Sequence, residues 1–428
     1  MTNDILEDVA EIIMGQSPAS TTCNIDGVGI PLLNGPTEFG SHHPLAVQFT
    51  TDAKKIAKPG DILFCVRGST TGRMNWSDQI YAIGRGIGAI RHKQGIEYQP
   101  LVRGVIECEL SDLLTQATGS TFPNVSASQL SKIRWPALDD AEQRRIAHIL
   151  GTLDDKIENN RKTAKTLEAM AQAIFQSWFV DFDPVRAKMA GASKESICKR
   201  LKLTPEILDL FPDRLVDSEL GEIPEGWEIG TLESLAALVT DSVSPGRSPN
   251  TVFEHYSIPA FDVGRMPAME LGESIKSNKY LVKQNAVLVS KLNPHTPRIW
   301  LPSIGKIPAI CSTEFMQFVP PTLGDRSYLY CLMNSQSMQE EVLKHVTGST
   351  GSRQRAQPSQ ISKVKILFTQ SYIQKVFTHK ASLLLNAAAI NLMESITLAS
   401  LRDTILPKLI SGEIRVPEAE HLIEEAAG

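Results

Sequence analysis

The stretch Asp139–Trp178, DDAEQRRIAHILGTLDDKIENNRKTAKTLEAMAQAIFQSW, sets the interpretation of the whole chain. Its apolar residues recur at alternating steps of four and three, which is typical of a helix that carries one narrow seam for a partner helix. The predicted seam is Ile146, Leu150, Leu153, Ile157, Asn160, Ala164, Leu167, Ala171, Ile174 and Trp178. We interpret the stretch as a coiled-coil strut, and a long core helix of a globular domain is the alternative.

The second half of the chain repeats the order of motifs found in the first half. A short amphipathic segment, a buried apolar run, a polar loop and a Thr-Gly-Ser-Thr loop recur in that order at nearly constant spacing. The matching pairs are Leu6–Val9 with Leu232–Leu235, Ile62–Val66 with Ala286–Ser290, Thr118–Thr121 with Thr347–Thr350, and Ser128–Ile133 with Ser359–Val364. One short match can arise by chance, but an ordered series indicates an internal duplication.

A second long helix is predicted from about Tyr372 to Ile405. It supplies the partner that the first strut needs. Its predicted seam is Leu383, Asn386, Ile390 and Met393. Asparagine interrupts both seams, at positions 160 and 386. Either these two side chains fix the register of a coiled coil, or the seam opens there and water solvates them.

These elements predict an α+β protein with two mixed α/β domains, separated by two long helices that form an antiparallel coiled coil with a pseudo-twofold internal repeat. The first domain covers residues 1–137, and the first strut covers residues 138–180. A packed connector, residues 181–226, leads to the second domain, residues 227–368. The second helical region and the C-terminal tail cover residues 369–428. The simplest geometry holds the two domains apart on antiparallel struts.

Composition limits the class of protein. The chain of 428 residues has a formal net charge of −5, whereas a protein that covers DNA alone is usually basic. The six cysteines are scattered without a Cys-x-x-Cys pair, which is typical of reduced thiols. The N-terminal sequence lacks the basic and apolar regions of a secretory signal, and no apolar stretch reaches membrane-spanning length. We therefore expect a cytoplasmic protein without a membrane partner.

Four motifs around the helices carry a resemblance to a known family. They are Glu142–Ile149 after the Trp135-Pro136 strand end, Leu167–Phe175 running into Ser177–Pro184, Ser218–Trp227, and Leu406–Ile414. With these motifs the chain resembles the specificity subunit of a Type I restriction-modification system over essentially its whole length. One departure is that Gly226-Trp227, which leads into the second domain, has no counterpart at the N-terminus.

The resemblance implies two target-recognition domains, each reading one half of a bipartite, gapped DNA site, and helices that space them and dock two modification subunits. It places S-adenosylmethionine for adenine methylation in those subunits. ATP and Mg²⁺ for translocation and cleavage belong to restriction subunits, and no cofactor is expected in this chain. Since half-sites on one face of the duplex lie about 34 Å apart, the gap is expected to be about 5 to 8 base pairs. The implied role is phage defence.

Polar loops after the apolar strands are the candidate DNA contacts. Arginine suits guanine edges, and asparagine and glutamine suit adenine. In the first domain the candidates are Arg67, Ser69, Thr70, Thr71, Arg73, Ser120 and Thr121. In the second domain they are Lys291, Asn293, His295, Arg298, Ser349, Thr350, Ser352, Arg353, Gln354 and Arg355, of which Arg353 and Arg355 are the strongest single candidates. For each residue a solvated loop is the alternative, and the identical Thr-Gly-Ser-Thr loops also fit a structural role.

The sequence lacks the motifs expected of the catalytic subunits. Its Pro320-Pro321 pair is not part of an (Asn/Asp)-Pro-Pro-aromatic methyltransferase loop, and Gly68–Arg73 has neither the spacing nor the lysine of a P-loop. Gly84–Gly88 is glycine-rich, but a plain turn explains it better than a nucleotide site. Two alternatives from other classes are a coiled-coil adaptor without DNA readout and a fused DNA methyltransferase with an unrecognised site.

Overall fold

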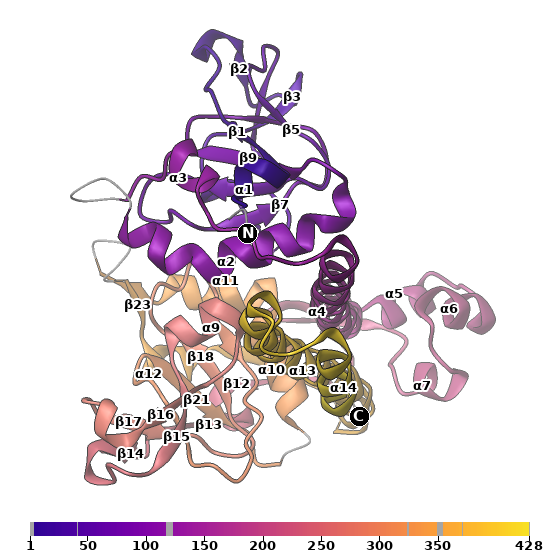
Figure 1. The fold of residues 1–428 in the computed structure, drawn as a ribbon. Coiled ribbons are helices and arrows are strands. Elements are labelled where there is room, and N and C mark those ends of the chain that lie inside the picture. The colour runs from indigo at the N-terminus through magenta and orange to yellow at the C-terminus, as the bar shows by residue number, and fades with distance from the viewer. Residues whose placement is uncertain are drawn as a thin grey trace. The chain divides into compact units, whose positions relative to one another are not determined.

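The computed structural model of the chain describes residues 4–40, 42–116, 123–322, 325–348, 354–369 and 371–427. The chain divides into two compact units (Figure 1). The first unit is Met1–Lys162 with Leu392–Gly428, and the second is Thr163–Asn391. Each long helix therefore contributes one part to each unit.

The first unit contains two β-sheets. Their strands are β1 (Ala10–Met14), β2 (Cys23–Asn24), β3 (Ile30–Leu33), β4 (Gln48–Thr50), β5 (Ile56–Ala57), β6 (Ile62–Cys65), β7 (Met74–Trp76), β8 (Tyr81–Ile83) and β9 (Ile87–His92). One sheet is antiparallel in the order β1-β9-β6-β7. The other has the order β2-β4-β3-β8-β5, with β3 parallel to β8. The continuous apolar run of β6 is buried along its whole length, as is typical of a strand covered on both faces.

The second unit contains two larger sheets and three strand pairs. The sheet strands are β13 (Ala237–Val239), β14 (Ser242–Val243), β15 (Val252–Tyr256), β16 (Ala268–Leu271), β17 (Lys279–Leu281), β18 (Val287–Ser290), β19 (Ile299–Trp300), β20 (Ala309–Cys311) and β21 (Phe315–Val319). The pairs are β10 (Leu215–Ser218) with β11 (Gly221–Pro224), β12 (Glu228–Thr231) with β24 (Lys365–Phe368), and β22 (Val346–Thr347) with β23 (Arg355–Ala356). The sheet orders are β13-β21-β18-β19 and β14-β17-β20-β15-β16, with β15 parallel to β20.

The strand orders confirm the internal repeat. The antiparallel sheet β1-β9-β6-β7 has the same order and directions as β13-β21-β18-β19. In the mixed sheets, β4-β3-β8-β5 corresponds to β16-β15-β20-β17, with one parallel pair at the centre of each. The fifth strand differs, because β2 lies beside β4 whereas β14 lies beside β17, on the opposite edge. The duplication therefore preserves the common strands and varies the sheet edges.

The first unit also contains helical segments. They are η1 (Ser20–Thr22), η2 (Pro36–Glu38), η3 (Ile96–Tyr98), α1 (Leu6–Val9), α2 (Gln99–Thr115), α3 (Ala127–Ser131), α14 (Val416–Ala427), and the parts within this unit of α4 (Asp140–Phe175) and α13 (Ser371–Ser411). Gly104 lets α2 approach both long helices, because a Cβ there would lie 2.6 Å from Leu406 and 3.3 Å from Leu150. This contact seats the first domain on its helix pair.

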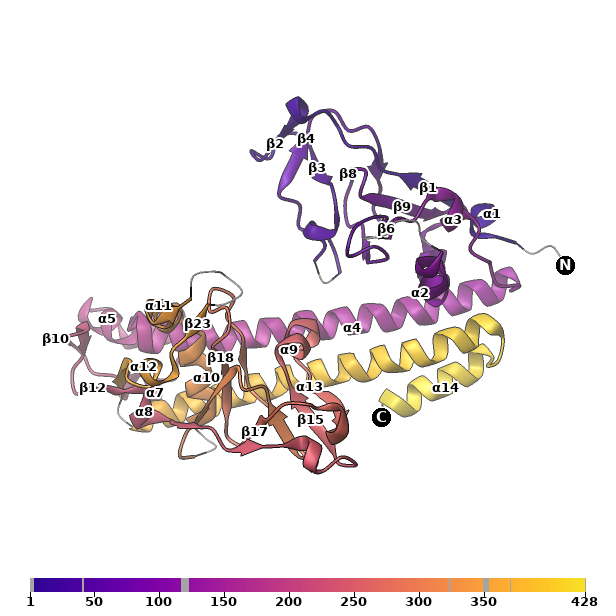
Figure 2. The ribbon, with the colours of Figure 1, turned by 90° about the vertical axis from the view of Figure 1, so that its left-hand side faces the viewer.

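In the first unit α4 and α13 run antiparallel (Figure 2). The hydroxyl of Ser395 donates to the Ile157 carbonyl at 3.3 Å, and further along the pair Arg402 binds the carboxylate of Asp154. The predicted seam residues Ile146, Leu150, Leu153 and Ile157 are buried against α13 and α14. Asn160 is also buried, and its amide nitrogen has no hydrogen-bond partner among the described residues. The alternating spacing thus lies on the packed face of α4.

The second unit packs its part of the long helices through aromatic side chains. Phe377 of α13 lies 5.6 Å from Phe175, 6.1 Å from Trp178 and 5.1 Å from Phe179, measured between ring centroids. Of the predicted α4 seam here, Ile174 and Leu167 are half-buried. The other helices of this unit are η4 (Gln176–Val180), α5 (Asp183–Met189), α6 (Lys194–Leu201), α7 (Pro205–Asp209), α8 (Leu232–Leu235), η5 (Pro245–Arg247), α9 (Ile258–Gly264), η6 (Gly272–Ser274), α10 (Arg326–Asn334), α11 (Gln336–Lys344) and α12 (Pro358–Ile361).

The predicted seam of the second long helix is corrected by the structure. Leu383, Ile390 and Met393 are 60%, 68% and 48% exposed, and Asn386 is exposed as well. The buried positions of α13 in the second unit are instead Ile373, Phe377, Ala381, Leu385 and Ala388. A shift of two positions turns a helix by about 200°, so the prediction chose the opposite face.

The reason for this error is the composition of α13. Its most apolar window reaches a mean hydropathy of 1.4, enough by length and composition alone to pass as a membrane span, which corrects the expectation that no apolar stretch reaches that length. An apolar helix gives periodicity little to distinguish its faces. The buried face also carries Ala381 and Ala388, small residues that add little to a hydrophobic pattern. Large residues on the other face therefore dominated the prediction.

Candidate nucleic-acid interface

In the first unit, three loops meet where β6 ends. The amide of Val66 donates to the Gly86 carbonyl at 3.0 Å, and the carbonyl of Val66 accepts from the amide of Val125 at 2.8 Å. Arg67 forms an isolated β-bridge with Asn124. The polar loop after β6 is thus held between the β8–β9 loop and the segment that precedes α3. The sequence predicted polar contacts from the first of these segments and from the Thr118–Thr121 loop, and that loop lies outside the described residues.

The predicted side chains of the first loop differ in how they are held. Arg67, Ser69 and Thr70 are exposed. Thr71 is half-buried, with its hydroxyl 2.8 Å from both the Gly68 and Pro123 carbonyl oxygens, so it ties two of the loops together. Arg67 is the cation of this loop that is exposed to solvent and has no side-chain partner among the described residues.

Arg73 has a different environment. Its guanidinium donates to the carbonyl of Phe39 at 2.9 Å and lies 5.8 Å from the centre of the Phe39 ring. Further donations reach the carbonyls of Pro36 and Gly40 at 3.3 and 3.4 Å. These contacts anchor the 36–40 loop, so Arg73 stabilises the shape of the site in the free protein.

Arg85 is a candidate that the sequence analysis missed. It is exposed in the tight β8–β9 loop, next to Gly86, whose carbonyl accepts a hydrogen bond from the amide of Val66. Gly84 and Gly86 are required there, because a Cβ on either would lie 2.5 Å or less from atoms of Asn34. The glycine-rich pattern therefore serves a close backbone approach. An arginine between two such glycines was the available signal, since a constrained loop presents its side chain outward.

In the second unit the corresponding loops form the same junction after β18. The amide of Lys291 donates to the Glu314 carbonyl at 2.9 Å, and the carbonyl of Lys291 accepts from the amide of Ala356 at 2.9 Å. Leu292 forms an isolated β-bridge with Arg355. The amide of Asn293, a residue in the left-handed conformation at φ 52°, donates to the Gln354 carbonyl at 3.0 Å.

Two arginines of the second junction are paired with carboxylates. Arg355 makes a bidentate contact with Glu314, with both nitrogen-to-oxygen distances at 3.0 Å, and its side chain is 43% exposed. Arg298 binds Asp262 in the same manner at 2.6 and 2.9 Å, with only 13% of its side chain exposed. Bidentate pairing fixes the plane of a guanidinium. Arg355 is therefore oriented and still accessible, whereas Arg298 is largely covered.

The remaining predicted contacts divide into two groups. His295 is exposed, and Lys291, Asn293 and Gln354 are half-buried. Six predicted residues lie outside the described residues: Ser120, Thr121, Ser349, Thr350, Ser352 and Arg353. Within the described part of the chain, no group of three or more His, Cys, Asp or Glu side chains is arranged to hold a metal ion.

Comparisons with known proteins agree with this architecture. Residues 5–169 match the family described as Type I restriction modification DNA specificity domain. The Type I restriction enzyme HindI specificity subunit of Haemophilus influenzae is 26% identical over 414 residues, covering 85% of this chain and 88% of that protein. The MjaIX specificity subunit of Methanocaldococcus jannaschii is 24% identical over 437 residues, covering 96% and 93%.

A solved structure shares the fold. The S subunit of a Type-I restriction-modification system from M. genitalium matches with a TM-score of 0.57 at 14% identity, over 95% of each chain. Duplicated α/β domains with paired loops, combined with two long helices, define a class of two-domain recognition proteins. Residues 5–169 match the specificity domain of this family, and over most of its length the chain is similar to the specificity subunits of Type I restriction-modification systems. Specificity subunits are non-catalytic, and they supply the DNA sequence specificity of such systems.

Proposed function

We propose that each recognition domain reads one half of a bipartite, gapped DNA site through its loop junction. The observation that carries this proposal is that the two junctions are built by the same backbone hydrogen bonds, at Val66 in one domain and Lys291 in the other, but present different side chains. A constant backbone with variable side chains is what two different half-sites require, since bases are distinguished by side-chain donors and acceptors.

The long helices act in this proposal as the ruler between the half-sites. Half-sites read from one face of the duplex lie about one helical turn apart, and this corresponds to a gap of about 5 to 8 base pairs. Inserting one heptad into α4 adds about 10 Å of helix at 1.5 Å per residue. The gap in the recognised motif should then lengthen, and an unchanged gap would show that the helices do not set the spacing.

We further propose that two modification subunits dock on the helices, with S-adenosylmethionine in those subunits and ATP and Mg²⁺ in restriction subunits of a cytoplasmic complex. The exposed face of α13 supports this docking, because Leu383, Asn386 and Ile390 follow the three-and-four spacing of a coiled-coil seam and lack a partner helix among the described residues. Changing Leu383 and Ile390 to glutamate should reduce co-purification of the modification subunit at least about tenfold. Unchanged co-purification would place the docking surface elsewhere.

A base-resolution adenine methylome tests the proposed function directly. Cells that carry the chain with its modification subunit are compared with cells that lack only this chain. A bipartite motif that disappears with the chain supports the proposal and gives the target. An unchanged methylome together with a stable complex with a methyltransferase favours the adaptor alternative, and binding of S-adenosylmethionine by the isolated chain in calorimetry favours a fused methyltransferase.

A further inference from the structure

A groove of about 530 Å³ lies in the first unit between the edges of its two sheets. β1 is the outermost strand of one sheet, and β5 is the outermost strand of the other. Both strands line the groove, which also contains the side chains of Lys55, Lys58 and Arg91. An edge strand without a partner exposes backbone N–H and C=O groups, and an extended chain can pair with them.

The hydrogen bonds of β1 identify which residues face the groove. Gly15 donates to the Ile87 carbonyl, and Val9 accepts from the Lys93 amide, so alternate residues from 9 to 15 bind β9. Ile12 and Met14 lie between them, and their amides and carbonyls point to the outer edge. No backbone partner for either amide is found in the described part of the chain.

The groove is cationic on the side of β5. Lys54 is paired with Asp52 at 2.6 Å. Lys55 and Lys58 are exposed, and in the described part of the chain neither ammonium group has a carboxylate within 4.0 Å. Lys55 and Lys58 thus leave positive charge available beside the free edge of β1.

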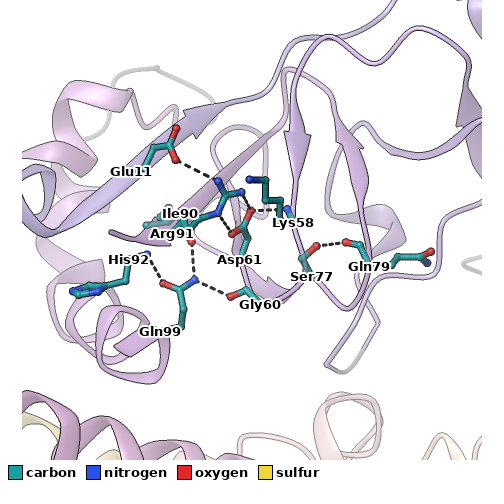
Figure 3. Close-up of polar contacts among 10 residues, drawn as sticks. All are labelled: Glu11, Lys58, Gly60, Asp61, Ser77, Gln79, Ile90, Arg91, His92 and Gln99. Atoms are coloured by element: carbon teal, nitrogen blue, oxygen red, sulfur yellow. Dashed lines mark hydrogen bonds and ion pairs between the residues drawn. The ribbon is translucent and has the colours of Figure 1, made fainter. Parts of the chain in front are cut away.

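An ion-pair network makes one end of the groove rigid (Figure 3). Arg91 donates to both oxygens of Asp61, at 2.7 and 2.6 Å, and reaches Glu11 of β1 at 3.3 Å. Asp61 is buried and also accepts from the backbone amide of Lys58 at 2.7 Å. The turn that carries Lys58 is therefore fixed relative to β1, so little ordering would remain to be lost on binding.

The second unit has the same strands without the same charges. By strand register, Lys58 corresponds to Lys283, which is paired with Asp241. Lys55 corresponds to Tyr280. The free lysines are thus specific to the first domain, and they are not required by the common fold.

We propose that the groove binds an extended, acidic peptide segment of a partner protein, which adds to β1 as a further strand. The amides and carbonyls of Ile12 and Met14 would pair with the peptide backbone, and acidic side chains would meet Lys55 and Lys58. Half-buried Ile13 and exposed Ile56 supply apolar contact along the same space. A DNA backbone fits less well, because free edge carbonyls repel phosphate oxygens whereas a peptide satisfies both donors and acceptors.

The test uses the full chain and a fluorescent, end-capped decapeptide of alternating glutamate and valine. Two control peptides replace glutamate by lysine, or valine by proline to prevent strand addition. A short DNA duplex of random sequence serves as the competing ligand. Binding is followed by fluorescence anisotropy, and hydrogen exchange measures protection at the β1 amides. The expected result is binding of the acidic valine peptide alone, with slower exchange at Ile12 and Met14.

Variants separate backbone pairing from charge. Ile12→Pro removes an outward amide and keeps the inward bonds of the edge strand, so it should weaken peptide binding at least about tenfold. Ile12→Ala is the matched control, since it loses the same side chain but keeps the amide. Met14→Pro replaces Ile12→Pro if the latter does not fold. The double variant K55E/K58E should weaken binding by at least as much, while K199E/R200E on exposed connector residues should not.

Three outcomes would overturn the proposal. The acidic peptide does not bind, or it binds without protecting the β1 amides. In the third outcome, random-sequence duplex binding falls in K55E/K58E but not in Ile12→Pro, which would make the groove a phosphate contact. None of these depends on the methylome, so the proposed function and this inference fail separately.

Discussion

The two recognition domains build one junction from different side chains. Arg67 in the first domain occupies the bridge position that Leu292 occupies in the second, and Asn124 occupies the position of Arg355. The backbone hydrogen bonds around these positions are equivalent. The two domains therefore share the backbone positions of the junction, but the arginine lies on a different segment in each.

The arginines also differ in their partners. Arg355 is oriented by Glu314, whereas Arg67 extends to solvent. An oriented guanidinium loses less freedom on binding, but it must share or release its carboxylate to contact a base. A free arginine adapts to its target at a greater entropic cost. On binding, the cost at Arg355 is therefore mainly the loss of its carboxylate contact, whereas the cost at Arg67 is mainly the ordering of its side chain.

The interiors differ in the same way. In the first unit, α4 packs through aliphatic residues such as Leu150 and Ile157. In the second unit, the helix contact is aromatic and centres on Phe377, which is fully buried. The two domains therefore share a topology that two kinds of packing can hold.

The largest expected effect concerns that aromatic contact. Phe377→Ala should destabilise the second unit by about 3–5 kcal/mol, because it removes a buried ring and leaves a cavity. Leu383→Ala is the matched control on the exposed face of the same helix and should change stability by less than about 0.5 kcal/mol. Urea unfolding of both variants measures the difference. Equal losses of stability would mean that Leu383 is packed as tightly as Phe377, and would contradict the assignment of Phe377 to the buried face of α13.

The long-helix comparison shows what the sequence could predict. The internal repeat and the apolar runs that form strands could be predicted from the sequence. The packed face of α4 could also be predicted, because charged residues separate the seam positions of that helix. The buried face of α13 could not be predicted, because the small residues Ala381 and Ala388 are buried while Leu383 and Ile390 are exposed. Hydrophobic patterns record side-chain size and polarity, but close helix approach depends on small residues.

The candidate site was predictable to a similar extent. The loops after the central strands were identifiable from their polarity and their place in the repeat. The partners of Arg73 and Arg298 were not, because the Phe39 carbonyl and the Asp262 carboxylate come from segments more than 30 residues away along the chain. Arg85 was missed because its neighbouring glycines suggested only a turn. Long-range partners decide which polar residues remain available.

The next largest effect concerns the two junction arginines, Arg67 in the first domain and Arg355 in the second. Arg67→Ala should weaken recognition of the first half-site by about 1–3 kcal/mol without a comparable loss of stability, because its side chain is exposed. Arg355→Ala should act on the second half-site instead. Binding to duplexes with one half-site scrambled assigns each loss to a domain. Loss at both half-sites from one substitution would contradict independent reading, and Arg145→Ala provides an exposed helix control.

A smaller effect is expected where the loops of the first junction are tied together. Thr71→Val keeps the shape of the side chain and removes a hydroxyl that bridges Gly68 and Pro123, so it should cost about 1 kcal/mol of stability. Ser69→Ala alters an exposed hydroxyl in the same loop and should be nearly neutral. If Ser69→Ala costs as much as Thr71→Val, the junction is not held by this bridge.

The smallest expected effect compares a buried histidine in each domain. Burial lowers the pKa of His92 and of His255 below the ordinary value of 6.5. Nearby carboxylates oppose the shift at both, Glu97 and Asp140 at His92, and Glu270, which lies 3.3 Å from Nδ1, at His255. His92 instead accepts a hydrogen bond at Nδ1 from the amide of Gln94, which requires a neutral ring nitrogen. The unfolded chain therefore takes up a proton that folded His92 resists as pH falls below about 6.5.

This difference predicts that acid weakens the first unit through His92 more than it weakens the second through His255. His92→Gln should reduce the loss of stability between about pH 7.5 and about pH 5.5 by up to about 1 kcal/mol, and His255→Gln should reduce it less. Hydrogen exchange at backbone amides, measured as a function of pH, assigns the loss of stability to one unit or the other. A larger effect from His255→Gln would mean that the Glu270 contact does not hold a proton there, and that burial governs both histidines alike.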